Sequence, residues 1–258
     1  MNRQSIAQIK ELLTQVTSKD NPLLKELSLD DRKGVQSALK STLSRLEKQS
    51  KLVTQFEEMK VFENLAREKG YTYIAGVDEV GRGPLAGPVV TAAVILPSNF
   101  KAYGLTDSKK LSKSQREQFH CQIKKEAIAY SVTFTDAKVI DEVNIYEATK
   151  QSMITSIQNL AVKPDYVLID AMPLDIDLPN ESFIKGDARS ISIAAASVLA
   201  KVERDIYMEQ QSKVYPGYQF EKNAGYGTKN HLIAIEERGL TPLHRRSFEP
   251  IKSMIKNS

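Results

Sequence analysis

Residues 73–88 read Y-I-A-G-V-D-E-V-G-R-G-P-L-A-G-P, and this stretch joins a strand to a group of chemically active residues. Its apolar first half predicts a buried strand that ends in two adjacent carboxylates, Asp78 and Glu79. Carboxylates at the tip of a buried strand are costly unless a cation lies beside them. An arginine between two glycines follows at residues 81–83, and glycines allow a backbone or a ligand to approach closely. The stretch therefore indicates a site for a metal ion and a phosphate group.

The chain beyond residue 70 alternates between strand-like and helix-like patterns, which is typical of an α/β domain. Its apolar and β-branched runs predict strands over residues 72–79, 88–96, 130–135, 165–170 and 182–185. The segments between them predict helices over residues 112–129, 141–160 and 190–212. Past residue 215 the chain becomes looser and more basic, and we interpret residues 215–258 as a C-terminal segment that contacts the substrate.

Residues 1–69 have a different composition, with one of the 12 glycines and one of the 10 prolines of the chain. Apolar residues at helical spacing predict an all-helical extension, whose last helix runs over roughly residues 31–69. The extension is either an accessory arm that binds nucleic acid or an element for packing and partner binding. Its 13 lysines and arginines barely exceed its 10 acidic residues, so charge does not decide between the two.

Composition limits the class of protein. With 41% apolar residues over 258 positions the chain can bury a core, but its longest apolar run is too short to cross a bilayer. The first residues lack the pattern of a signal peptide, so we expect a soluble cytoplasmic protein. The single cysteine, Cys121, excludes an internal disulfide framework and is expected to be buried. A net charge of +4 permits nucleic acid binding without indicating it.

Two more acids share the setting of Asp78. Asp170 ends the apolar run 166–169, and Asp187 follows the short run 183–186. If these runs are neighbouring strands, their acidic tips converge with Asp78 and Glu79, and four acids together need a counter-charge. A hard cation such as Mg²⁺ or Mn²⁺ prefers these oxygen ligands. Two such ions about 4 Å apart activate a water and stabilise the leaving oxygen of a phosphodiester.

Three questions stay open for these acids and the neighbouring arginine. Adjacent strand residues point to opposite faces, so Asp78 and Glu79 can share a site only if a bulge or the end of the strand breaks the alternation at Glu79. Asp187 could simply cap the helix that begins near residue 190. Arg82 either holds a phosphate or pairs with Glu79 within the protein.

Separated motifs in this chain resemble the ribonuclease HII family in the family's order, over about residues 71–250. They are G-V-D-E-V-G-R-G-P-L-A-G-P (76–88), D-S-K-K-L-S (107–112), L-I-D-A (168–171), K-G-D-A (185–188) followed by S-I-A-A-A-S-V-L-A-K-V-x-R-D (192–205), and G-Y-G-T (225–228). The resemblance implies an RNase H-like α/β fold over residues 70–258, with a central mixed sheet flanked by helices and a helical C-terminal segment. Residues 1–69 lie outside the shared core.

The resemblance also implies an activity and its residues. The family cleaves the RNA of RNA–DNA hybrids and incises 5′ to ribonucleotides embedded in duplex DNA, leaving 3′-hydroxyl and 5′-phosphate ends. Its metal-binding acids, with Mn²⁺ or Mg²⁺ as cofactor, fall on Asp78, Glu79, Asp170 and Asp187. Its ribose-sensing Gly-Arg-Gly motif falls on Gly81, Arg82 and Gly83, and its junction-sensing tyrosine falls on Tyr226. Candidate contacts to backbone phosphates are Lys109, Lys110, Lys185, Lys229, Arg245 and Arg246.

The expected partner is thus an RNA–DNA hybrid or a duplex with embedded ribonucleotides, and no membrane association is expected. We also expect a monomer that acts in ribonucleotide excision repair and DNA replication. Three competing functions remain: a ribonuclease HIII-like nuclease, a non-catalytic hybrid-binding module, and a metal-dependent hydrolase of small phosphate esters. The helical extension and the G-Y-G-T motif favour ribonuclease HII over HIII. The presence of all four acids argues against loss of catalysis.

Overall fold

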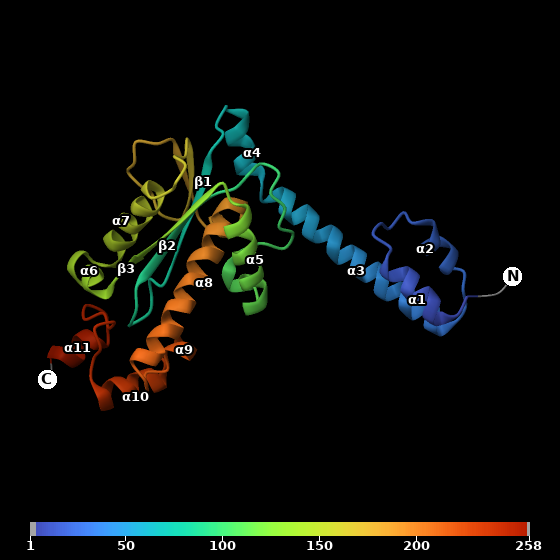
Figure 1. Cartoon of the computed structure of the whole chain (residues 1–258). Helices are drawn as coiled ribbons and strands as arrows, with labels where there is room; N and C mark the ends of the chain where they lie inside the picture. Colours follow the sequence, from blue (N-terminus) through green and yellow to red (C-terminus); the bar gives the residue numbers. More distant parts are fainter. Residues whose placement is uncertain (1–3, 257–258) are drawn as a thin grey trace. The chain divides into compact units, whose positions relative to one another are not determined.

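The computed structural model describes residues 4–256, and its packing divides the chain into two compact units, Met1–Glu57 and Glu58–Ser258. The first unit is helical, with α1 (Ile6–Thr14), α2 (Pro22–Leu27) and most of α3 (Lys33–Glu58) around a core of leucine, isoleucine and valine (Figure 1). Ser5 begins α1 with a capping box, and Asn21 caps α2 ahead of Pro22.

The prediction of a single helix over residues 31–69 is wrong, because α3 ends at Glu58 and a separate helix, α4 (Val61–Glu68), follows. Between them, the carbonyl of Met59 accepts a hydrogen bond from the backbone of Ile191, outside any helical ladder. Helix α4 packs in the second unit, where its apolar face contacts strand residues and the beginning of a later helix.

The second unit is built on a five-stranded sheet of order β3-β2-β1-β4-β5. The sheet is mixed, as the family resemblance implied. Strands β1, β2 and β3 are antiparallel neighbours, whereas β4 and β5 run parallel to β1. The strands are β1 (Ile74–Val80), β2 (Val89–Ile95), β3 (Ala129–Thr135), β4 (Tyr166–Asp170) and β5 (Asn180–Phe183).

Helices cover both faces of this sheet (Figure 1). The long helix α8 (Ile191–Val214) packs across β1 and β2 and is itself covered by α5 (Lys113–Glu126). Helix α7 (Ile145–Gln158) packs on the other face, against β2 and β3. Gly76 of β1 allows the close approach of α8, since a Cβ there would lie 2.1 Å from the carbonyl carbon of Ser192.

The helix expected over residues 141–160 is also two helices, α6 (Ala137–Val143) and α7. Asn144 separates them with a φ of 71°, and its side chain accepts hydrogen bonds from the first backbone groups of α7. The C-terminal segment contains α9 (Phe220–Asn223), α10 (Lys229–Arg238) and α11 (Ile251–Lys256), which share an apolar cluster with residues 85 and 86.

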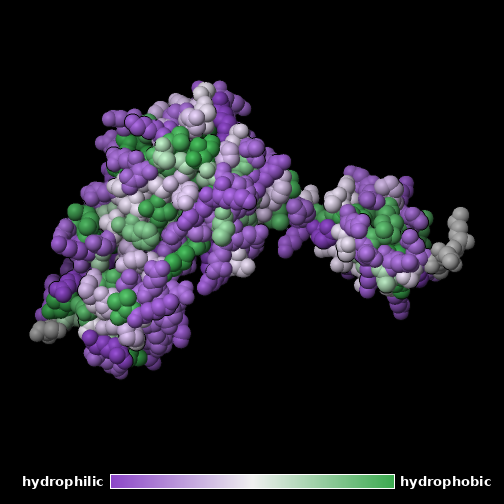
Figure 2. Space-filling model, in the orientation of Figure 1, coloured by the Kyte–Doolittle hydropathy of each residue, from purple (hydrophilic) through white to green (hydrophobic). Residues whose placement is uncertain are grey.

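Two surface features bear on the sequence expectations. Within residues 4–256, no helix is long and apolar enough to cross a membrane, and the face seen in Figure 2 is mostly hydrophilic. Cys121 is exposed, so the expected burial of its thiol is wrong. Its neighbours Phe119, His120 and Ile123 form the buried stripe of α5, and Cys121 lies off that stripe.

Candidate active site

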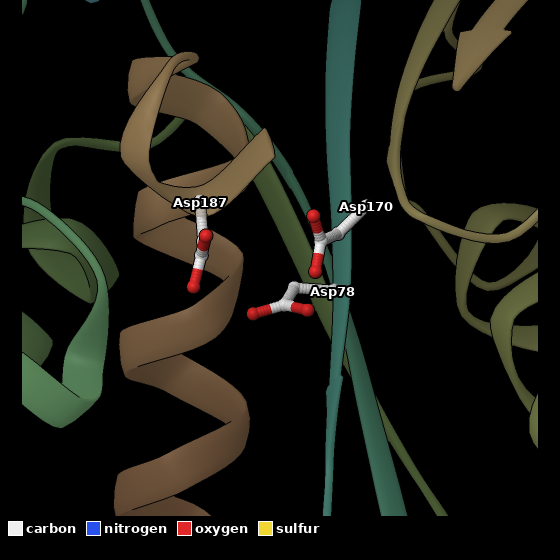
Figure 3. A group of neighbouring side chains, drawn as sticks. All are labelled: Asp78, Asp170 and Asp187. Atoms are coloured by element: carbon white, nitrogen blue, oxygen red, sulfur yellow. The ribbon is translucent and has the colours of Figure 1, made fainter. Parts of the chain in front are cut away.

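Three aspartates that are far apart in the chain meet beside β1, where β4 ends. Carboxylate oxygens of Asp78, Asp170 and Asp187 all lie within 4.8 Å of one another. Figure 3 shows the three side chains turned toward a common point between β1 and the beginning of α8. The structure therefore brings Asp78, Asp170 and Asp187 together as expected.

The sheet register explains the pairing of the first two aspartates. Strands β1 and β4 are parallel neighbours, and their ladder ends with Val77 opposite Ile169. Asp78 and Asp170 are the next residue on each strand, so they lie side by side within the sheet. Residues of β1 alternate between faces, and Asp78 shares the α8 face with Gly76.

Asp187 is brought in by a 3-10 turn, Gly186–Ala188, which precedes α8. The backbone N–H of Gly186 donates to the Oδ1 atom of Asp170 at 2.6 Å. The alternative role of Asp187 as a helix cap is not observed, because Ser190 caps α8 through its hydroxyl. The turn thus ties Asp187 to Asp170.

Burial and mutual repulsion raise the pKa values of these carboxyl groups above those of ordinary aspartates. Burial, then the charges of Glu79 and Asp170, raise the pKa of Asp78 well above its usual value. Burial, followed by the charge of Asp107, raises the pKa of Asp187 to about 6. Burial also raises the pKa of Asp170, although the charge of Lys109 opposes this. A group of hard oxygen donors that resists ionisation by itself fits a divalent cation.

Glu79 lies outside the group of three. The ladder of β1 with β2 continues unbroken through Val80, so the break expected at Glu79, by a bulge or by the end of the strand, is not observed. The Glu79 side chain therefore begins on the α7 face. Its Oε1 atom is 3.4 Å from Nη1 of Arg82, while Oε2 is buried with no hydrogen-bond partner among residues 4–256. Burial raises the pKa of Glu79 to about 7 against the opposing charge of Arg82. An unpartnered buried oxygen is suited to a cation.

The Gly-Arg-Gly turn lies beside Tyr226. Gly81 has a φ of +89°, which favours glycine, and Arg82 and Gly83 are exposed. A Cβ on Gly83 would lie 3.7 Å from the ring of Tyr226, which is 48% exposed. Two motifs separated by more than 140 residues in the sequence therefore form one surface.

Two buried arginines fix this surface, and sequence analysis missed their role. Arg245 was expected to contact phosphate, but it is fully buried, and its guanidinium donates to the carbonyls of Gly81, Arg82 and Gly87. Arg204, also buried, donates to the carbonyls of residues 86, 88 and 224. No carboxylate of residues 4–256 forms an ion pair with either arginine. The only sequence signal for Arg204 was its place as the arginine of the V-x-R-D motif at residues 202–205.

The remaining predicted cationic residues are exposed: Lys109, Lys110, Lys185, Lys229 and Arg246. Lys109 is close enough for its charge to lower the pKa of Glu79, Asp170 and Asp187. Lys185 has a φ of 58° directly before the turn that carries Asp187. Asp107, in the D-S-K-K-L-S motif, is a further acid beside Asp187 that the sequence analysis did not assign.

Family models match nearly the whole chain. The ribonuclease HII model matches residues 75–251, and the ribonuclease HII N-terminal domain model matches residues 5–67. The chain belongs to the ribonuclease HII family. It is similar to ribonuclease HII of Enterococcus faecalis, with 55% identity over 99% of this chain and 100% of the relative, and to that of Bacillus anthracis, with 53% identity over 99% and 100%.

Solved structures share the fold at low identity. Ribonuclease H2 from Pyrococcus horikoshii OT3 superposes with a TM-score of 0.62 at 24% identity, covering 71% of this chain and 97% of that one. Bst-RNase HIII in complex with Mn²⁺ gives 0.57 at 20% identity, covering 72% and 70%. Membership of the ribonuclease HII family makes the chain a ribonuclease, and the expected RNase H-like fold is confirmed.

Proposed function

We propose that the chain hydrolyses the RNA strand of RNA–DNA hybrids and incises 5′ to single ribonucleotides embedded in duplex DNA, leaving 3′-hydroxyl and 5′-phosphate ends. One observation carries the proposal: three aspartates gather within 4.8 Å, and the Gly-Arg-Gly turn that follows Asp78 and Glu79 in the chain exposes Arg82 and Gly83 next to Tyr226. A cluster of acids provides for phosphodiester hydrolysis, and the adjoining turn and ring provide a surface for reading one sugar.

Asp78, Asp170 and Asp187, with Glu79 at the margin, would hold two divalent ions, Mn²⁺ or Mg²⁺. The raised pKa values of the four carboxyl groups support this, because a cation would relieve the cost of ionising them together. When bound, the ions supply activation of a water and neutralisation of charge on the leaving oxygen.

The substrate-reading groups are Gly81, Arg82, Gly83, Tyr226, Lys109 and Lys185. Only a 2′-hydroxyl distinguishes RNA from DNA at one sugar, and the exposed glycine-flanked backbone lets donors and acceptors come near it. The Tyr226 ring stacks on the adjoining sugar or base. Arg82, Lys109 and Lys185 are exposed cations around the acids and would contact phosphates.

We further propose a cytoplasmic monomer that acts in ribonucleotide excision repair and DNA replication. In this view residues 70–258 form the catalytic domain and residues 215–258 its substrate-binding segment. The buried contacts of Arg204 and Arg245 support that role, because they join residues 81–88 to the loop before Tyr226. Residues 1–69 would form an accessory extension whose last helix, α4, packs in the second unit.

The decisive experiment is incision of a duplex that carries one ribonucleotide, with and without Mn²⁺. We expect a single cut 5′ to the ribonucleotide, only with metal, and none in an all-DNA duplex of the same sequence. Asp78→Asn should abolish the cut while affinity for the duplex survives. Full activity of Asp78→Asn would refute the metal assignment, and binding without any metal-dependent cut would favour the non-catalytic module.

A further inference from the structure

Glu63 is a buried carboxylate that the site described so far does not use. It lies on α4, within the span matched by the N-terminal domain model, and is 1% exposed. Its Oε1 atom accepts hydrogen bonds from the Ser190 hydroxyl at 2.6 Å and from the Ser192 backbone at 2.9 Å. Its Oε2 atom is buried with no partner among residues 4–256.

These contacts complete the beginning of α8. A helix leaves its first backbone N–H groups without partners inside the helix. In α8 the N–H of Ile191 donates to the Met59 carbonyl at 3.0 Å, that of Ser192 to Glu63, and that of residue 193 to the Ser190 hydroxyl at 3.2 Å. Two of these three acceptors thus come from residues 59–63. A carboxylate here is also favoured by the dipole of a 24-residue helix.

The same few residues hold the turn that carries Asp187. The Ser190 backbone donates to the Gly186 carbonyl at 2.8 Å, so the cap of α8 and the 3-10 turn are one hydrogen-bonded structure. Beside Glu63, the Phe62 ring lies 4.1 Å from that of Phe183, and the Arg189 guanidinium lies 5.0 Å from the Phe62 ring. The turn is therefore held by Asp170 on one side and by α4 on the other.

We propose that Glu63 is a positioning residue for the metal centre: it fixes the turn 186–190, and thereby Asp187, through its bonds to Ser190 and Ser192. It touches neither substrate nor metal. The inference rests on the proposed metal-binding role of Asp187. It also means that a residue in the family's N-terminal domain span helps to build the catalytic centre.

The test is Mn²⁺ binding to the full-length protein, measured by calorimetry without substrate. Glu63→Ala should weaken binding by about tenfold, as loss of a supporting hydrogen bond near metal ligands does. Glu63→Gln, which keeps an acceptor oxygen, should stay within about threefold of the parent. The matched control is Asp136→Ala, which removes a carboxylate cap from α6; it should lower thermal stability and leave Mn²⁺ binding unchanged.

Ser190→Ala provides a milder variant if Glu63→Ala does not fold, and it should weaken Mn²⁺ binding in the same direction. Unchanged binding in both Glu63→Ala and Ser190→Ala would overturn the inference, as would equal weakening in Glu63→Gln and Glu63→Ala. If the unsubstituted protein binds no Mn²⁺, the proposed metal centre itself fails and takes the inference with it. Mn²⁺ binding by the unsubstituted protein that weakens in Glu63→Ala but not in Glu63→Gln supports both the metal centre and the positioning role of Glu63.

Discussion

Glu79→Gln tests how much the buried charge of Glu79 lowers the free energy of unfolding, because it removes the charge and keeps the shape of the side chain. The side chain is 13% exposed, one oxygen faces Arg82 and the other has no partner among residues 4–256. Glutamine has almost the same volume and can still accept from Arg82, but it cannot ionise. We expect the metal-free variant to be more stable than the parent above neutral pH.

The size of the effect follows from the pKa of Glu79, which burial raises from 4.5 to about 7. Below pH 4.5 the carboxyl is protonated in both the folded and the unfolded chain, so its burial carries no charge penalty. Between pH 4.5 and 7 the unfolded chain releases the proton and the folded chain keeps it, so stability falls as pH rises. The fall is complete above pH 7 and amounts to about 3 kcal/mol, at about 1.4 kcal/mol for a difference of one in pKa.

The assay is urea unfolding of both proteins in EDTA, at intervals from pH 5 to pH 8.5. The difference between the two unfolding free energies removes the other titrating groups, and it should grow in favour of Glu79→Gln by about 2–3 kcal/mol across this range. Adding Mn²⁺ at pH 8 should narrow the gap, because a bound cation stabilises the ionised parent. A difference that stays constant with pH would refute the reasoning.

Three further substitutions test the packing and the substrate surface. Gly76→Ala should lower the free energy of unfolding by about 3 kcal/mol or more, because the new Cβ would collide with the α8 backbone; a urea curve matching the parent's would contradict this packing. Arg245→Lys should cost about 3 kcal/mol or more in the same assay, because an ammonium donates from a single point and cannot reach the three buried carbonyls that Nε, Nη1 and Nη2 of the guanidinium reach separately; an unchanged midpoint would count against this role of Arg245. Tyr226→Ala should slow incision at a single ribonucleotide by about tenfold or more while cleavage of continuous hybrids changes less; equal losses on both substrates would contradict a junction-sensing role.

The local elements of this protein could largely be predicted from its sequence. Each expected strand of the α/β domain has a counterpart in the sheet, because β-branched runs and their punctuation are local signals. Errors arose where a non-local bond ends a helix, as at Met59, and where one residue with positive φ divides a helical pattern, as at Asn144. Helical spacing cannot reveal either event, since neither changes the apolar periodicity.

The acids of the site were also readable as a group, because each follows an apolar run that predicted a strand. Their relative arrangement was not. Pairing of β1 with β4 places Asp78 beside Asp170, while the regular ladder with β2 leaves Glu79 outside the group of three. Register is a property of neighbouring strands, and it decides which of two adjacent carboxylates faces a site.

By itself, the sequence determined the residue types that the proposed chemistry needs: oxygen donors after apolar strand-like runs, glycines around one arginine, and a tyrosine between glycines. Only the tertiary structure decided which charged groups are buried and what they hold. Arg204 and Arg245 serve backbone carbonyls, and Glu63 holds the beginning of α8. The physical reason is that burial and hydrogen-bond partners come from segments distant in the chain. A charged residue expected at the surface from its local sequence can therefore be buried and hydrogen-bonded to the backbone of a loop.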